Sequence, residues 1–266
     1  MSDYSHYRYL KVDVRDGVAY IVITKPERFN ACDLADHREF SRILRDIAAD
    51  DSVRVAVVTG VGKAFSVGGD LDLLERVLDQ SSDDAETLFA DARELVHAHV
   101  ELDKPVIAAV NGHAMGSGAA FAFFCDFIIM ETQATIADGH IRAALSAGDG
   151  GALIWPLAVG LTRAKKYLIT GDGIGAVEAE RIGLVTEVVE EGASLGRATE
   201  IAQRLAAGPQ RAIRYTKRTL NQTLAAALPT FDLSLALEMR SMRTAEAAAA
   251  IAELRTTRRP AIAPEP

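Results

Sequence analysis

Two glycine-rich turns, each directly after an apolar run, hold the residues of this chain that are best placed for chemistry. One turn follows the apolar run 105–110 and reads Asn-Gly-His-Ala-Met-Gly-Ser-Gly over residues 111–118, before an apolar stretch of helical character. The other turn follows the run 53–59 and spans residues 60–71. A strand–glycine–helix junction leaves backbone N–H groups free at a helix start, where the helix dipole also favours negative charge. Such a junction binds a phosphate or an oxyanion that develops on a carbonyl, or it is a tight turn packed against a neighbouring segment.

Taken together, the two turns resemble the crotonase superfamily, also called the enoyl-CoA hydratase/isomerase family. That family has the pattern A-F-(S/C/A)-x-G-x-D-(L/I), which residues 64–71 match as Ala-Phe-Ser-Val-Gly-Gly-Asp-Leu. About forty residues later the family has P-V-I-A-A-(V/I)-N-G-x-A-x-G-(G/S)-G, which residues 105–118 match. Further ordered matches extend the resemblance from Val18 to about Pro260; they include residues 25–31, 148–151, 168–172, 178–179, 183–185 and 188–189.

The resemblance implies a fold, an assembly and a ligand. The fold is α/β: repeated ββα units wound into a crotonase-like spiral core over residues 1–205, which carries the acyl-CoA site. Residues 206–266 form a helical subdomain that builds a homotrimer or a dimer of trimers. Coenzyme A enters as part of the substrate, so we expect no separate cofactor and no metal.

The chemistry of this family depends on two backbone N–H groups that hold the thioester oxygen as it becomes an enolate. By resemblance the donors here are the N–H groups of Gly69 and Ser117. Fixed donors in a water-poor site typically contribute ~3–4 kcal/mol each to stabilising such a charge. Serine replaces the usual glycine at 117, and its hydroxyl either contacts the substrate or caps the following helix.

The sequence departs from the hydratase pattern at the catalytic carboxylates. Typical hydratases place two glutamates on either side of the site, and the corresponding positions here are Ala120 and His140. Two-glutamate hydration is therefore not expected. His140 instead precedes Asp149 by nine positions, and a His–Asp pair can activate water at neutral pH, since the unperturbed imidazole pKa of ~6.5 lies near working pH. The alternatives are that His140 is a buried structural histidine and that Asp149 caps the helix that follows it.

The H-x8-D spacing, followed by G-x-x-x-x-W-P over residues 150–156, also resembles the β-diketone hydrolases of the superfamily, which cleave a carbon–carbon bond with water. Those enzymes have a second histidine in the glycine turn, where this chain has Ser117. Three hypotheses therefore stand: an acyl-CoA hydratase or isomerase with His140 and Asp149 in place of the glutamates, a hydrolase that cleaves a C–C bond of a β-diketone or β-keto thioester, and a catalytically silent CoA-binding trimeric scaffold.

The expected coenzyme A site also follows from the resemblance. Residues 26–31 and 64–71 keep the small residues that surround the adenine and pantetheine in the family. A lysine that is often found in the first segment is replaced by Glu27, with Arg28 beside it, and arginine is suited to meet a phosphate. The residues expected to bind substrate or coenzyme A are Arg28, Ala64, Val67, Gly68, Asp70 and Leu71.

The segments that must position these residues alternate between strand-like and helix-like patterns, which predicts an α/β domain with crossover connections. The expected strands are 18–24, 53–59, 106–110 and 127–130, and the expected helices are 34–49, 71–77 and 85–102. From residue 193 the chain reads as helical, with helices at 194–207, 210–222 and 231–254 and a break at Leu228-Pro229. Its apolar residues, Leu233, Leu237 and Met242 among them, exceed what one thin layer covers, so we expect them against another subunit. The end from Arg258 is expected to be frayed.

Composition agrees with a compact cytoplasmic enzyme. A chain of 266 residues, 49% hydrophobic and 25% charged, can bury one large core, with or without a small appendage. The formal net charge of −8 argues against a nucleic-acid surface, and neither turn carries a nucleotide-phosphate motif. The N-terminus has no secretory pattern, and no apolar stretch reaches the ~20 residues that span a membrane. Cys32 and Cys125 have no metal-like spacing and are expected to be buried thiols in a reducing compartment.

Overall fold

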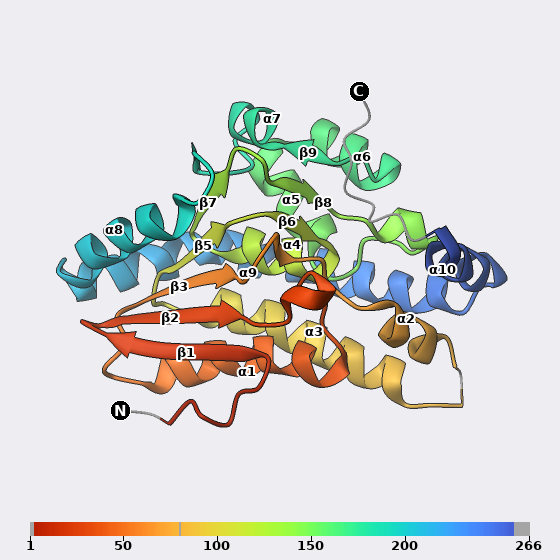
Figure 1. Cartoon of the computed structure of the whole chain (residues 1–266), viewed down its shortest axis with the longest axis horizontal. Helices are drawn as coiled ribbons and strands as arrows, with labels where there is room; N and C mark the ends of the chain where they lie inside the picture. The colour runs from red at the N-terminus through yellow and green to blue at the C-terminus, as the bar shows by residue number, and fades with distance from the viewer. Residues whose placement is uncertain (1–2, 80, 258–266) are drawn as a thin grey trace.

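The computed structural model describes residues 3–79 and 81–257. Its main layer is a six-stranded sheet in the order β1-β2-β3-β5-β7-β10 (Figure 1). The first strand pairs antiparallel with β2, and the other neighbours pair in parallel. The strands are β1 (Leu10–Arg15), β2 (Val18–Ile23), β3 (Val55–Gly60), β5 (Val106–Val110), β7 (Phe127–Glu131) and β10 (Glu187–Val189).

A second, smaller sheet lies beside the main one, in the order β4-β6-β8-β9. Its strands are β4 (Ala64–Ser66), β6 (His113–Met115), β8 (Thr135–Ala137) and β9 (Ile174–Gly175). Each central strand of the main sheet continues into a strand of the small sheet and then into a helix: β3-β4-α2 (Leu71–Leu78), β5-β6-α4 (Gly116–Phe124), and β7-β8 followed by η2 (His140–Ala143) and α5 (Gly151–Val159). The predicted spiral of ββα units is therefore confirmed.

Helices cover both faces of the main sheet, because its strands carry apolar residues on both faces. Ala19, Ile21 and Ile23 of β2 belong to the larger core, whereas Val18 and Tyr20 pack on the other face against α8. Burial on both faces is typical of parallel sheets. The remaining helices are η1 (Pro26–Arg28), α1 (Leu34–Ala49), α3 (Asp84–Glu101), α6 (Leu161–Thr170), α7 (Ala176–Arg181), α8 (Ser194–Ala206), α9 (Gln210–Met242) and α10 (Ala245–Thr257).

The C-terminal helices differ from the sequence prediction. The expected break at Leu228-Pro229 is wrong, because α9 continues through Pro229 to Met242. A proline costs one helical hydrogen bond, but the helix beyond it is held by the burial of Phe231 and Leu235 in the core. The chain instead breaks just after Met242, where the Thr244 hydroxyl accepts the N–H of Ala247 at 3.2 Å, within the first turn of α10.

Two further expectations for this region can be compared with the structure. Met242 was expected at a subunit contact, but it is buried within its own chain, whereas Leu233 and Leu237 are exposed. The frayed end predicted from Arg258 lies outside the described residues. Cys32 and Cys125 are buried free thiols, as expected. In the described part of the chain, no helix has both the length and the apolar character needed to cross a membrane.

Candidate active site

The two glycine turns meet backbone to backbone. A Cβ atom added to Gly68 would lie 2.8 Å from the Met115 carbonyl oxygen and 3.0 Å from the Ser117 nitrogen, and Gly68 has a φ of +79°. A Cβ on Gly118 would lie 2.3 Å from the carbonyl oxygen of Ser66. A larger residue at either position would push the turns apart, so the glycines allow their close approach.

The backbone N–H groups of Gly69 and Ser117 have no acceptor within the bridge or the helix to which their residues belong. Cys32 donates its N–H to Gly68 O at 2.8 Å and accepts the N–H of Asp70 at 3.0 Å, so it forms a parallel bridge opposite Gly69. In such a ladder the N–H of Gly69 points away from Cys32. Ser117 lies in the first turn of α4, where N–H groups have no acceptor within the helix. Gly69 and Ser117 line the same pocket.

The Ser117 hydroxyl does not cap α4, because the N-cap residue is Met115 and no side chain caps this helix. Its Oγ lies 3.7 Å from the sulfur of Cys32. The hydroxyl therefore contacts a buried thiol instead of the helix start.

The pocket between these turns and the helices has a volume of about 490 Å³. In one part of the pocket wall, the carboxylates of Asp138, Asp149 and Glu238 lie around His140. The rest is mainly apolar and comes from α2, α3 and α9: Leu73, Leu74, Leu88, Phe89, Ala92 and Met242. An apolar chamber with a few polar groups is typical of a small-molecule site.

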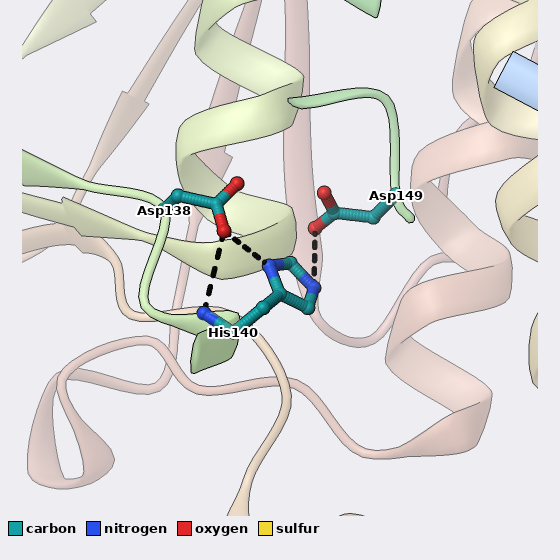
Figure 2. Close-up of side chains that lie close together, drawn as sticks. All are labelled: Asp138, His140 and Asp149. Carbon is teal, nitrogen blue, oxygen red and sulfur yellow. Dashed lines mark hydrogen bonds and ion pairs between the residues drawn. The ribbon is translucent and has the colours of Figure 1, made fainter. Parts of the chain in front are cut away.

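His140 lies among three carboxylates (Figure 2 shows two of them). Its Nδ1 is 2.8 Å from Oδ1 of Asp138, and its Nε2 is 3.5 Å from Oδ2 of Asp149. Oε1 of Glu238, which comes from α9, is 3.4 Å from the same Nε2. Asp138 follows β8, and Gly139 with a φ of +81° turns the chain so that His140 begins η2. Asp138 therefore orients the ring, while Asp149 and Glu238 share its other nitrogen.

These charges determine protonation. Burial alone lowers the pKa of His140, but Asp149, Asp138 and Glu238 outweigh it and hold that pKa well above 6.5. Burial raises the pKa of Asp149 above its ordinary 3.8, Asp138 and Glu238 raise it further, and His140 opposes them. An imidazolium therefore stands next to a carboxyl group that gives up its proton less readily than a solvated aspartate does.

Asp149 is not the N-cap residue of the helix after it, because the N-cap residue of α5 is Gly150. Both of its carboxyl oxygens are buried. Their partners are Nε2 of His140, 3.5 Å from Oδ2, and the backbone N–H of Gly151, which lowers the pKa of the carboxyl group. Burying a carboxylate close to two others is costly, and such a group beside a pocket favours a functional role.

The other expected site residues fall into two groups. Arg28, Val67, Asp70 and Leu71 line the pocket with Gly69 and Ser117, whereas Ala64 and Gly68 do not. Ala64 is buried in β4, where its carbonyl accepts the Asn30 amide at 2.8 Å, and Gly68 supports the Ser117 backbone.

Asp70 and Arg28 form an ion pair with each other. Oδ1 of Asp70 accepts the N–H of Leu73 at 2.7 Å and so caps α2. Arg28 pairs with Asp70 at 3.1 Å and with Asp72 at 2.9 Å. A phosphate at this side of the pocket would have to compete with two carboxylates for the guanidinium.

The pocket residues that the sequence analysis did not single out include Asp138, Glu238 and His37. Glu238 had a signal, because it shares the helical spacing of Phe231, Leu235 and Met242, and a carboxylate in such an apolar row is unusual. The sequence signal for Asp138 was weaker: it is an acidic residue two positions before His140. His37 lies on α1 and is only 3% exposed, and a lone histidine on an amphipathic helix gives no signal in sequence.

Comparison with known proteins agrees with this geometry. The profile of the enoyl-CoA hydratase/isomerase family matches residues 13–253. The chain belongs to this family. Crystal structures of relatives include an enoyl-CoA hydratase/isomerase from Mycobacterium paratuberculosis, with a TM-score of 0.90 and 32% identity over 94% of this chain and 100% of the other. The superfamily and the fold predicted from the sequence are thereby confirmed.

Individual relatives in the family are hydratases and isomerases. The chain is 33% identical to an (E)-benzylidenesuccinyl-CoA hydratase from Thauera aromatica, over 78% of this chain and 80% of the relative. It is 31% identical to a crotonyl-CoA hydratase from Syntrophomonas wolfei, over 81% and 82% of the two chains. The structure of a monofunctional enoyl-CoA isomerase from M. smegmatis matches with a TM-score of 0.68 and 33% identity, over 83% and 96% of the two chains. The relatives of this chain thus include both hydratases and an isomerase of enoyl-CoA type.

Proposed function

We propose that this enoyl-CoA hydratase/isomerase family member acts on an acyl-CoA thioester and stabilises the enolate between the N–H groups of Gly69 and Ser117. In this proposal His140 and Asp149 replace the usual glutamate pair. The observation that carries it is the buried Asp149 carboxyl group, which pairs with His140 at 3.5 Å and lines the same pocket as Gly69 and Ser117. The free thiols Cys32 and Cys125 fit a reducing cytoplasm.

For hydration, the buried Asp149 carboxylate turns toward the pocket that it lines and accepts a proton from water as the water oxygen bonds to the β-carbon of the enoyl group. The Cα=Cβ electron pair moves toward the thioester, whose oxygen becomes an enolate oxyanion held by the two N–H groups. The enolate then re-forms the carbonyl and takes the proton from Asp149 at the α-carbon, so the carboxylate is regenerated. For isomerisation, the same carboxylate removes a proton at one carbon and returns it at another.

His140 acts on Asp149 rather than on the substrate in this scheme. Its positive charge favours the carboxylate form, which is the base, while burial and the two other carboxylates favour the protonated form, which is the acid. A carboxyl group balanced in this way can both take and give a proton near neutral pH.

The direct test is to offer short 2-enoyl-CoA thioesters in D₂O, with calorimetry for binding and NMR for products. We expect binding below millimolar concentration and either a 3-hydroxyacyl-CoA or a shifted double bond, with deuterium at the α-carbon. Absence of acyl-CoA binding at millimolar ligand would contradict the proposal.

A second candidate is a hydrolase that cleaves a C–C bond of a β-diketone or β-keto thioester. It is favoured by the pairing of Arg28 with Asp70 and Asp72, which weakens the case for a phosphate-bearing ligand. The water deprotonated by Asp149 would then attack a carbonyl carbon, and the C–C bond would break to give a carboxylate and a stabilised enolate. Cleavage of a free cyclic 1,3-diketone would support this candidate. If neither substrate class is turned over, the remaining hypothesis is the catalytically silent CoA-binding scaffold.

We also propose the homotrimer, or dimer of trimers, that the helical segment 206–266 implies. Support comes from Leu233 and Leu237, which lie one turn apart on α9 and are 61% and 47% exposed; neighbouring exposed leucines mark an interface. We expect light scattering to give a trimer mass or a multiple of it at micromolar concentration, and Leu233→Asp with Leu237→Asp to dissociate it. The matched control is Leu195→Asp on α8, also an exposed leucine. A wild-type monomer would refute the assembly.

A further inference from the structure

His37 places one polar ring in the apolar wall of the pocket. It lies on α1, its residue is 3% exposed, and it lines the pocket with Leu73, Leu88 and Phe89. The neighbouring Arg38 pairs with Asp91 of α3 at 3.2 Å, which fixes α1 in place at this point. The ring therefore has a defined position in the apolar part of the pocket.

The two nitrogens of the His37 ring have different surroundings. Nδ1 is inaccessible and has no hydrogen-bond partner among the described residues. The ring therefore meets the pocket through its other side, which carries Nε2. A buried N–H without an acceptor is rarer and costlier than a buried acceptor without a donor, so the proton belongs on Nε2. This tautomer directs an N–H donor into the pocket.

The ring is also uncharged. Burial lowers the pKa of His37 to about 4, so at neutral pH the imidazole has one donor and one acceptor. A neutral donor suits an uncharged oxygen atom on a ligand, and it provides no partner for a plain hydrocarbon chain.

We propose that the acyl group of the substrate carries an oxygen atom, in a carbonyl, ether or hydroxyl group, that accepts a hydrogen bond from Nε2–H of His37. This inference rests on the proposed function for the site that the acyl group enters, and it adds the class of acyl group. His37 then selects oxygenated acyl groups over hydrocarbon ones, because a hydrocarbon leaves the donor buried and unpaired.

The test compares two thioesters whose acyl groups differ by one oxygen for one methylene, in wild type, His37→Leu and His37→Gln. We expect wild type to prefer the oxygenated thioester by roughly 10- to 100-fold in kcat/KM and in Kd, as loss of a buried hydrogen bond predicts. His37→Leu should bring the ratio of kcat/KM for the two thioesters close to one, and His37→Gln, which retains a donor, should keep part of the preference. A wild type without preference, or a leucine variant that keeps it, would overturn the inference.

Two measurements separate this inference from the proposed function. The same pair is offered as free carbonyl compounds, so that failure to bind coenzyme A refutes the thioester proposal while the His37 preference is still measured. Nitrogen-15 NMR of the wild-type ring at pH 7 should show the Nε2–H tautomer and a shift of that signal with the oxygenated ligand alone. An Nδ1–H tautomer, or equal shifts with both ligands, would refute the role of His37 even if the leucine variant failed to fold.

Discussion

Asp149→Asn and His140→Ala should each lower turnover by about 10²- to 10⁴-fold, the usual range for removing a positioned acid or base. Asparagine cannot accept the proton from water, and alanine at 140 removes the positive charge that favours the Asp149 carboxylate. We expect the fold to survive, because neither side chain belongs to the apolar core. Steady-state kinetics with circular dichroism would check both points.

Asp172→Asn provides a matched control, since this aspartate is exposed and lies outside the pocket. Ala120→Glu should restore hydratase character only in part, because the second glutamate position is still His140. Turnover like that of wild type in both Asp149→Asn and His140→Ala would show that the cluster is structural.

The same cluster predicts how activity depends on pH. The base form of Asp149 is needed, so kcat/KM should rise with pH, and its midpoint should lie above the ordinary aspartate range because burial raises this pKa. Glu238 also raises the pKa of Asp149, so Glu238→Gln should move the rising limb to lower pH. A limb that stays in place, or moves upward, would mean that Asp149 is not the titrating base.

Ser117→Pro should lower kcat by roughly 10²- to 10³-fold, because it removes one of the two proposed oxyanion donors. Proline is tolerated in the first turn of a helix, where the N–H has no helical acceptor, so α4 is expected to form. Ser117→Ala keeps the N–H and loses only the hydroxyl near Cys32, and its activity should stay within a few-fold of wild type. The measurement is single-turnover kinetics, with thermal unfolding to confirm the fold.

Equal activity of the proline and alanine variants would exclude the Ser117 N–H as a donor. An equal loss in both variants would instead assign the effect to the hydroxyl. The two results are distinguishable because one substitution changes the backbone and the other changes only the side chain.

The parts of the fold that were predicted are those with a local signal. The strands β3 and β5 contain uninterrupted apolar runs, Val55–Val58 and Val106–Val110, and the glycine turns have a required spacing. The three-residue strands β4, β6 and β8 were missed because so short a segment has no periodicity to detect. Pro229 was misjudged because burial of the residues after it, a tertiary effect, outweighs a local preference.

The candidate site divides in the same way. His140 and Asp149 are close in sequence, and the pattern around them could be compared with a family. Glu238 comes 98 positions after His140, and the contact between them depends on how α9 packs on the spiral, which no local spacing encodes. The role proposed for His37 depends on the different surroundings of its two ring nitrogens, which the sequence does not encode.

Because Glu238 lies on α9, the carboxylate cluster around His140 is completed late in synthesis. The ribosome delivers the two glycine turns and His140 long before this carboxylate, so a nascent chain holds an acid–base cluster that lacks one of its three negative charges. The cluster acquires its final electrostatics only when α9 has packed against the spiral. Exchange of the segment 206–266 between relatives would transfer Glu238 with it, so under the proposed mechanism the boundary proposed near residue 205 does not separate two activities.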